Sequence, residues 1–203
     1  MTDLHLTPEQ SWPVTGDDGL ARPPWAAHDP LLREYYDTEW GMPVTDEQGV
    51  FERVCLEGFQ VGLSWRLILQ KREALRSAFH GFDPEAVAGM SIEHLLGDAS
   101  LIRNRRKLEA AVNNAEATLA LRDEGTHLGE FVWSYQPAQT PVPRTMEEVP
   151  TRSAESEQLA KDLKKRGFTF VGPVTMYALM ESTGIIDTNL VGTWRRGASG
   201  VWV

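Results

Sequence analysis

Wherever the apolar residues of this chain form a pattern, they recur with the period of an α-helix. Phe51, Val54 and Cys55 form one such stripe, and a second stripe runs from Leu108 to Leu119. No segment shows the regular alternation of apolar and polar residues that is typical of a half-buried strand. The sequence therefore predicts an all-α fold.

The length of 203 residues allows one sizeable core or two small helical lobes packed together. Residues 1–21 are rich in Thr, Pro, Gly and Asp with little apolar periodicity, so we expect a disordered tail. Residues 22–203 are expected to form a single domain. Four prolines between Gln136 and Pro150 indicate an extended connection between the lobes.

Composition excludes several classes of protein. The single cysteine, Cys55, rules out a disulfide framework and a cysteine-rich metal site. There is no apolar run long enough to span a membrane and no signal-peptide pattern, so we expect a cytoplasmic protein. A net charge of -9 argues against indiscriminate nucleic-acid binding, although a local basic face can coexist with an acidic whole.

The stretch from Val54 to Trp65 is the strongest candidate for a functional site. Glu57 continues the apolar stripe of a helix that we expect to be capped by Thr45 and ended by Gly58. A carboxylate among apolar neighbours, followed by Gly62 and a tryptophan, suggests a pocket wall. The alternative is that Glu57 turns out to solvent at the end of the helix.

A helix, a short glycine-bounded turn and a second helix are predicted between about residues 163 and 182. The first helix ends in Lys164-Lys165-Arg166, and Pro173 begins the second. Backbone amides in such a turn can hold a phosphate group, and the neighbouring basic residues attract it. A glycine-rich turn between helices is also a common structural feature.

Two further clusters have both a structural and a functional interpretation. Asp29-Pro30 should begin a helix that carries Tyr35, Tyr36 and Trp40, and aromatic residues at this density are usually part of a core. The run from Arg103 to Lys107 places cations at a helix N-terminus, which is unfavourable unless an anion or a partner compensates them. A solvated face is the alternative.

Three motifs in this chain resemble those of the DNA-3-methyladenine glycosylase I family of helix-hairpin-helix proteins. They are Tyr35-Tyr-Asp-Thr-Glu-Trp-Gly41, Cys55-Leu-Glu-Gly-Phe-Gln-Val-Gly-Leu-Ser-Trp65 and Leu163-Lys-Lys-Arg-Gly-Phe-Thr-Phe-Val-Gly172. The resemblance runs from about Arg22 to Gly192. It implies two helical lobes with a base pocket between them, a double-stranded DNA substrate containing alkylated bases, no cofactor and a monomeric protein.

The resemblance also assigns roles to individual residues. Glu57, Tyr35 and Trp65 would form the base pocket, with Trp25 nearby. Gly62 and Leu63 would fill the gap that the extruded nucleotide leaves. The remaining DNA-binding residues would lie in and beside the hairpin: Lys164, Lys165, Phe170, Val171 and Gly172.

The chain departs from the family at two places. The family typically binds a structural zinc through two Cys and two His, but the matching positions here are Pro23, Tyr36, Asn189 and Thr193, so we expect no metal. Ile186-Asp187-Thr188 also resembles a stretch of the wider superfamily in which the Asp is catalytic. Asp187 is therefore a candidate catalytic residue, and the alternative is that it only caps the next helix.

The resemblance indicates a monofunctional glycosylase that hydrolyses the N-glycosidic bond of 3-methyladenine in DNA. This lesion is cationic, so aromatic faces and a carboxylate would attract it. No lysine lies in the pocket motifs to support a lyase activity. Loss of the zinc ligands leaves an alternative from another class: a non-catalytic DNA-binding or lesion-sensing protein.

Overall fold

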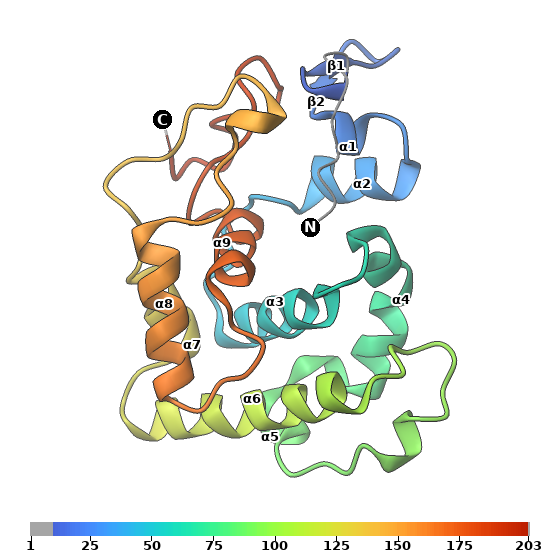
Figure 1. The fold of residues 1–203 in the computed structure, drawn as a ribbon, viewed down its shortest axis with the longest axis vertical. Coiled ribbons are helices and arrows are strands. Elements are labelled where there is room, and N and C mark those ends of the chain that lie inside the picture. Colours follow the sequence, from blue (N-terminus) through green and yellow to red (C-terminus); the bar gives the residue numbers. More distant parts are fainter. Residues whose placement is uncertain (1–9, 203) are drawn as a thin grey trace. The chain divides into compact units, whose positions relative to one another are not determined.

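A computed structural model describes residues 10–202 and divides the chain into two compact units (Figure 1). We call them the terminal unit, which comprises residues up to Pro43, Pro137–Thr151 and Glu181–Val203, and the central unit, which comprises Val44–Gln136 and Arg152–Met180. The predicted extended connection, residues 136–150, lies almost wholly in the terminal unit. It is held there by hydrogen bonds such as that from Val191 N to Pro143 O.

The described residues are mainly helical, as the periodicity predicts. In chain order the elements are β1 (Val14–Thr15), β2 (Ala21–Arg22), α1 (Pro24–Ala27), α2 (Pro30–Thr38), α3 (Glu47–Gln60), α4 (Trp65–Ala78), η2 (His80–Phe82), α5 (Pro84–Val87), η3 (Glu93–Leu95), α6 (Arg105–Asp123), α7 (Leu128–Trp133), η4 (Met146–Glu148), α8 (Ala154–Lys165) and α9 (Pro173–Ser182).

The described part of the predicted disordered tail is ordered. Two-residue strands β1 and β2 pair antiparallel, and buried Arg22 forms ion pairs with Asp18 and Asp37, each at 2.7 Å. These bonds fix residues 14–22, so the prediction of disorder is wrong for that segment. Residues 1–9 lie outside the described part of the chain.

Local sequence signals explain most helix boundaries. The Asp29 carboxylate accepts from the amides of Leu31 and Leu32, and Ser153 forms a capping box with Ser156 at the start of α8. The predicted boundaries of α3 are wrong at both ends. Asp46 caps this helix instead of Thr45, and α3 continues through Gly58 to Gln60.

The core of the central unit is built from aliphatic residues of α3, α4, α6 and α7 and from phenylalanines of α3 and of the 79–82 segment after α4. Phe79 stacks on Phe82 at 5.7 Å between ring centroids, and Phe59 and Phe51 each contact this pair. All four rings are almost fully buried. The core therefore fixes α3 and α4, which carry the second sequence motif.

Candidate active site and DNA interface

Glu57 lies inside α3 between buried Leu56 and Gly58, and only 4% of its surface is exposed. The alternative in which its side chain turns out to solvent is therefore wrong. Transfer of a carboxylate from water to such a position is unfavourable unless hydrogen bonds or a cation compensate for it. This environment suits a residue that binds a cationic group.

A tight turn connects α3 to α4 and presents two apolar side chains. Leu63 N donates to Gln60 O at 2.6 Å, and Gly62 has φ +76°, which the third position of a type II turn requires. Val61 is 46% exposed and Leu63 is 37% exposed. Trp65 follows as the first residue of α4, which is capped by Ser64.

Lys107 of α6 holds this turn in place. Its ammonium group donates to the carbonyl oxygens of Phe59 at 2.7 Å and Val61 at 2.5 Å, at the C-terminal end of α3. A cation at this position also stabilises the helix dipole. Burial lowers the pKa of Lys107. The helix that carries Glu57 and the turn that carries Leu63 are therefore fixed by the same side chain.

The connection between α8 and α9, residues 166–172, is the predicted hairpin, and α6 anchors it. The amide of Asn114 donates to Thr169 O at 3.1 Å, and its oxygen accepts from Thr169 N at 2.8 Å. Asn113 donates to Gly167 O at 2.7 Å. Because Asn114 is only 3% exposed, this two-way bond is shielded from water.

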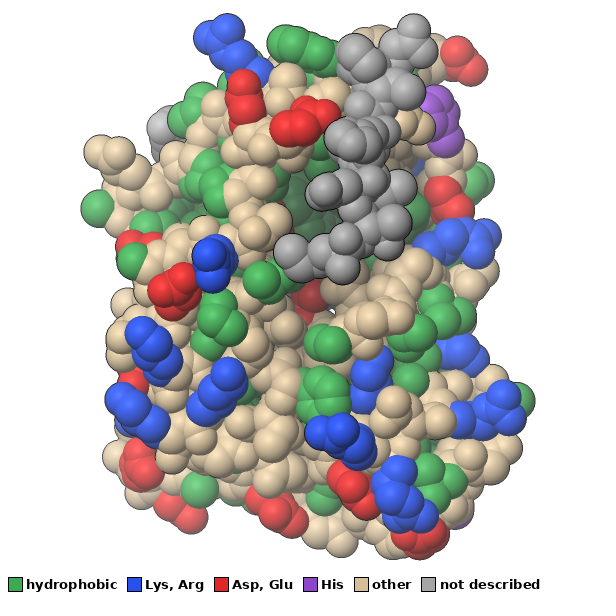
Figure 2. Space-filling model, in the orientation of Figure 1, with side chains coloured by type: hydrophobic (Ala, Val, Ile, Leu, Met, Phe, Trp, Pro, Cys, Tyr) green, Lys and Arg blue, Asp and Glu red, His purple; other side chains and the backbone are tan. Residues whose placement is uncertain are grey.

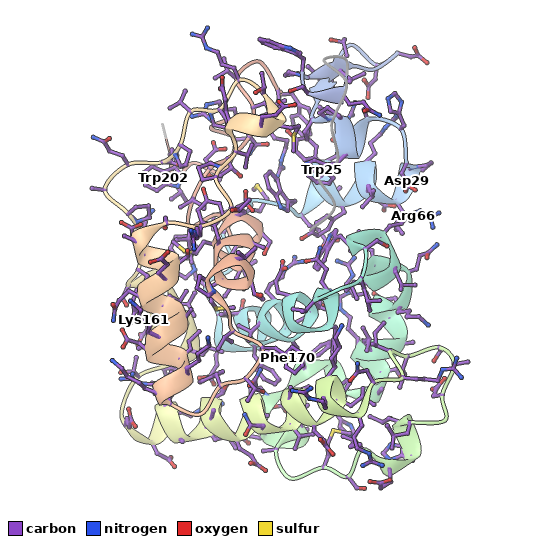
Figure 3. The ribbon with its side chains drawn as sticks, in the orientation of Figure 1. Trp25, Asp29, Arg66, Lys161, Phe170 and Trp202 are labelled. Carbon is purple, nitrogen blue, oxygen red and sulfur yellow. The ribbon has the colours of Figure 1, made fainter. Side chains whose placement is uncertain are left out.

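Phe170 in the hairpin has φ +57°, a conformation that costs a non-glycine residue about 1–3 kcal/mol. It lies beside α3 (Figure 3), where a Cβ added to Gly58 would be 3.4 Å from the Cβ of Phe170. Gly58 therefore lies inside the helix that carries Glu57 and faces the hairpin at van der Waals distance, instead of ending that helix. Strain of this kind often marks a functional segment.

The hairpin leaves backbone donors available. Within residues 10–202, no hydrogen bond uses the amides of Phe170, Val171 or Gly172. Pro173 begins α9 without an amide hydrogen, so the next amides are those of Val174 and Thr175. Val171 is 1% exposed as a whole residue, whereas its neighbours Phe170 and Gly172 are partly exposed. Lys164 is exposed, whereas exposed Lys165 pairs with Asp162 at 2.9 Å.

In the terminal unit, Tyr35 is 2% exposed on α2. Trp25 is half-buried, and its ring lies edge-on to Tyr36 at 5.4 Å and to Trp40 at 5.5 Å between centroids. Tyr36 and Trp40 stack on each other. The structural interpretation of the aromatic cluster is therefore confirmed for these rings, and Trp25 is part of the same cluster.

The Asp187 carboxylate is occupied by local donors. One oxygen accepts from the amide and the side chain of Asn189, each at 2.9 Å, and the other accepts from Gly197 N at 2.8 Å. No helix follows Asp187 in the described residues, so the carboxylate holds a turn instead of capping a helix. With three donors already bound, this geometry favours a structural role over a catalytic one.

The positions that match the family's zinc ligands do not fit a zinc ion. The Tyr36 hydroxyl donates to the Asn189 amide oxygen at 2.7 Å, and the Thr193 hydroxyl donates to Leu190 O at 2.8 Å. Burial raises the pKa of Tyr36 well above its usual range, so this phenol stays neutral. Zinc prefers thiolate and imidazole ligands, and Pro23 offers neither. Hydrogen bonds here join α2 to the C-terminal segment.

We predict that chelators leave the melting temperature of the protein unchanged, because the Tyr36–Asn189 hydrogen bond needs no metal. Thermal unfolding with and without EDTA, together with the zinc content of tag-free protein, checks this. Stoichiometric zinc, or a melting temperature that falls on chelation, would contradict the assignment.

The comparisons with known proteins agree on one family. The family model described as methyladenine glycosylase matches residues 25–196. DNA-3-methyladenine glycosylase 1 of Escherichia coli (strain K12) is 44% identical over 173 residues, which cover 83% of this chain and 92% of the relative. A crystal structure of 3-methyladenine DNA glycosylase I has a TM-score of 0.82 at 41% identity and covers 85% of this chain and 97% of the other. A variant of such an enzyme solved in complex with 3-methyladenine has a TM-score of 0.79 at 34% identity, with 83% and 94% covered.

Proposed function

The chain belongs to the methyladenine glycosylase family, and from this premise we propose that it excises 3-methyladenine from double-stranded DNA by hydrolysing the N-glycosidic bond. The observation that carries the proposal is buried Glu57, which is followed directly by the Gly62 turn and Trp65. A module that only binds DNA needs the hairpin but has no need of a buried carboxylate next to an exposed apolar turn.

The proposed reaction begins when the damaged nucleotide leaves the base stack. A methylated base pairs poorly, which lowers the cost of extrusion, and Leu63 with Gly62 would fill the gap. Glu57 would then accept hydrogen bonds from the cationic base, while Trp65 stacks on it. A cation–π contact adds about 0.5–2 kcal/mol. Tyr35 of the terminal unit is proposed as a second stacking residue, and Trp25 packs with Tyr36 and Trp40 in the same unit.

Bond cleavage itself would need little proton transfer, because the methylated base leaves as a neutral molecule. Catalysis would then rest on positioning of the nucleotide and on electrostatic stabilisation of the sugar cation before water attacks. We propose that Glu57 supplies the negative charge. We assign Asp187 to the turn that it holds, on account of its three bound donors.

The hairpin would hold the backbone of the damaged strand. The amides of Phe170 and Gly172, with those of Val174 and Thr175 after Pro173, would bind a phosphate group, and Lys164 and Lys165 would attract it. None of the helices in residues 10–202 has the length and hydrophobicity of a membrane span. We further propose that the protein acts as a monomer in the cytoplasm.

The experiment that separates the enzyme from a lesion-sensing protein measures abasic sites in methylated duplex DNA supplied in molar excess. The enzyme should convert many sites per protein molecule, and the product should be an intact abasic strand because no lyase step is proposed. Tight binding to methylated DNA without formation of abasic sites would support the sensor instead.

A further inference from the structure

A groove of about 740 Å³ lies beside the 61–63 turn on the central unit. The turn, α4, the 96–103 segment and the start of α6 form its walls. Its lining includes the cations Lys71, Arg103 and Lys107 and no carboxylate, in a chain whose net charge is -9. The groove is therefore a local cationic site that suits a polyanion.

Two of the three cations build the groove. Lys107 binds the carbonyl oxygens of Phe59 and Val61, and the Lys71 ammonium donates to Ala99 O at 2.8 Å. The bonds of Lys107 connect the 61–63 turn to α6. The bond of Lys71 connects the 96–103 segment to α4. These specific contacts fix the walls of the groove. The positive charges of Lys71 and Lys107 attract an anionic ligand at its edge.

Two arginines near the start of α6, Arg103 of the groove lining and Arg106, carry a charge that no described acidic residue neutralises. Arg103 and Arg106 are exposed and form no ion pair or hydrogen bond with the described residues, whereas Arg105 pairs with Glu93 at 2.6 Å. There is no acidic residue in the first turn of α6. Figure 2 shows Lys and Arg side chains gathered over α4 and the start of α6. Cations at a helix N-terminus are unfavourable unless an anion compensates them.

Helix α6 links this cationic groove to the hairpin. Asn104 lines the groove, and Asn114 binds Thr169 of the hairpin. These two asparagines are ten residues apart along α6 and its N-cap. At 1.5 Å per residue this separation is about 15 Å. The grooves that separate the two backbones of a duplex are about 6–12 Å wide, a few ångströms less than this separation and within the reach of long side chains. One helix can therefore present two phosphate-binding sites to two strands.

We infer that the groove, together with Arg103 and Arg106, binds the phosphate backbone of the strand opposite the damaged base, while the hairpin holds the damaged strand. This inference rests on the proposed function, which assigns the hairpin and Leu63 to DNA. Exposed Val61 and Leu63 lie at the groove edge, where the duplex would be opened. Arg103 and Arg106 contact the complementary strand close to that opening.

The test compares binding to two DNA ligands that carry an uncleavable abasic analogue: a duplex and the lesion strand alone. Reversing both charges in an Arg103→Glu/Arg106→Glu variant should weaken duplex binding and lower its salt dependence by about two units, one per lost phosphate contact. Binding to the lesion strand alone should not change. Because both side chains are exposed, the variant should fold, and Arg103→Gln/Arg106→Gln should show the same pattern to a smaller extent.

Two control variants sharpen the result. Lys164→Glu beside the hairpin should weaken binding to both ligands, and Arg152→Glu, at an exposed site with a distant ion pair of 3.8 Å, should weaken neither. In addition, neutral methylphosphonate linkages in the complementary strand should weaken binding of the wild type but not of the double variant. A double variant that binds the duplex as the wild type does, or that loses both ligands equally, overturns the inference.

Release of 3-methyladenine from methylated DNA by the wild type is measured in parallel. Absence of release would overturn the proposed activity, while the strand comparison would still test the groove, since it needs only binding. Normal release together with an unchanged duplex preference in the double variant would overturn the groove assignment alone.

Discussion

Replacing Glu57 by Gln should slow single-turnover release of 3-methyladenine about ten- to a hundred-fold. The substitution keeps the shape of the side chain but removes the charge that faces a cationic base. Loss of one charge-assisted hydrogen bond costs roughly 1.5–3 kcal/mol, which corresponds to that range in rate. Binding of free 3-methyladenine should weaken by a similar factor, and calorimetry can measure it.

A second carboxylate on α3 provides the matched control. Glu52 pairs with Arg76 at 2.8 Å and has no role in the proposed base binding, so Glu52→Gln should affect stability but not the release rate. If Glu57→Gln changes neither release nor base binding while Trp65→Ala abolishes both, recognition depends on stacking alone.

The second large effect is expected from Asn114→Asp, which should lower affinity for duplex DNA about five- to a hundred-fold. The aspartate can still accept from Thr169 N, but it places a carboxylate oxygen against Thr169 O. A buried polar group that loses its hydrogen-bond partner costs about 1–3 kcal/mol. In this variant the observed conformation of the hairpin is destabilised by that amount, which lowers the affinity for DNA. Binding of free 3-methyladenine should be unchanged, because Glu57 does not contribute to this anchor. Titrations with duplex and with free base measure the two affinities.

Asn113→Ala gives a graded comparison. Its bond to Gly167 O is exposed, so its loss should reduce DNA affinity less than Asn114→Asp does. Equal loss of DNA and free-base binding in Asn114→Asp, accompanied by a large fall in melting temperature, would indicate general destabilisation and contradict the positioning role.

Much of the fold could be predicted because it depends on local signals. Asp29, Ser153 and Pro173 each mark a helix start through capping or proline geometry, and the structure confirms them. The sequence predicts that α3 ends at Gly58, whereas the helix continues to Gln60 and Gly58 faces Phe170. The contact between Gly58 and Phe170 is tertiary, because 112 residues separate the two in sequence.

The anchoring residues were missed for a similar reason. Asn113 and Asn114 lie in the middle of a long helix. Because asparagine is a poor helix former, two of them at this place are a sequence signal of a tertiary role for their side chains. Their partners, Gly167 and Thr169, are more than 50 residues away. The sequence leaves the run from Arg103 to Lys107 either compensated by a partner or solvated. In the structure the long aliphatic chain of Lys107 allows its ammonium to reach the carbonyl oxygens at the end of α3.

The proposed glycosylase activity is tested most directly by mass spectrometry of the bases that purified wild-type protein releases from dimethyl-sulfate-treated duplex DNA, with Glu57→Gln measured in parallel. We predict release of 3-methyladenine by the wild type, without added metal or cofactor, and release by the variant that is slower by about ten-fold or more. DNA binding without release of 3-methyladenine would contradict the proposed glycosylase activity.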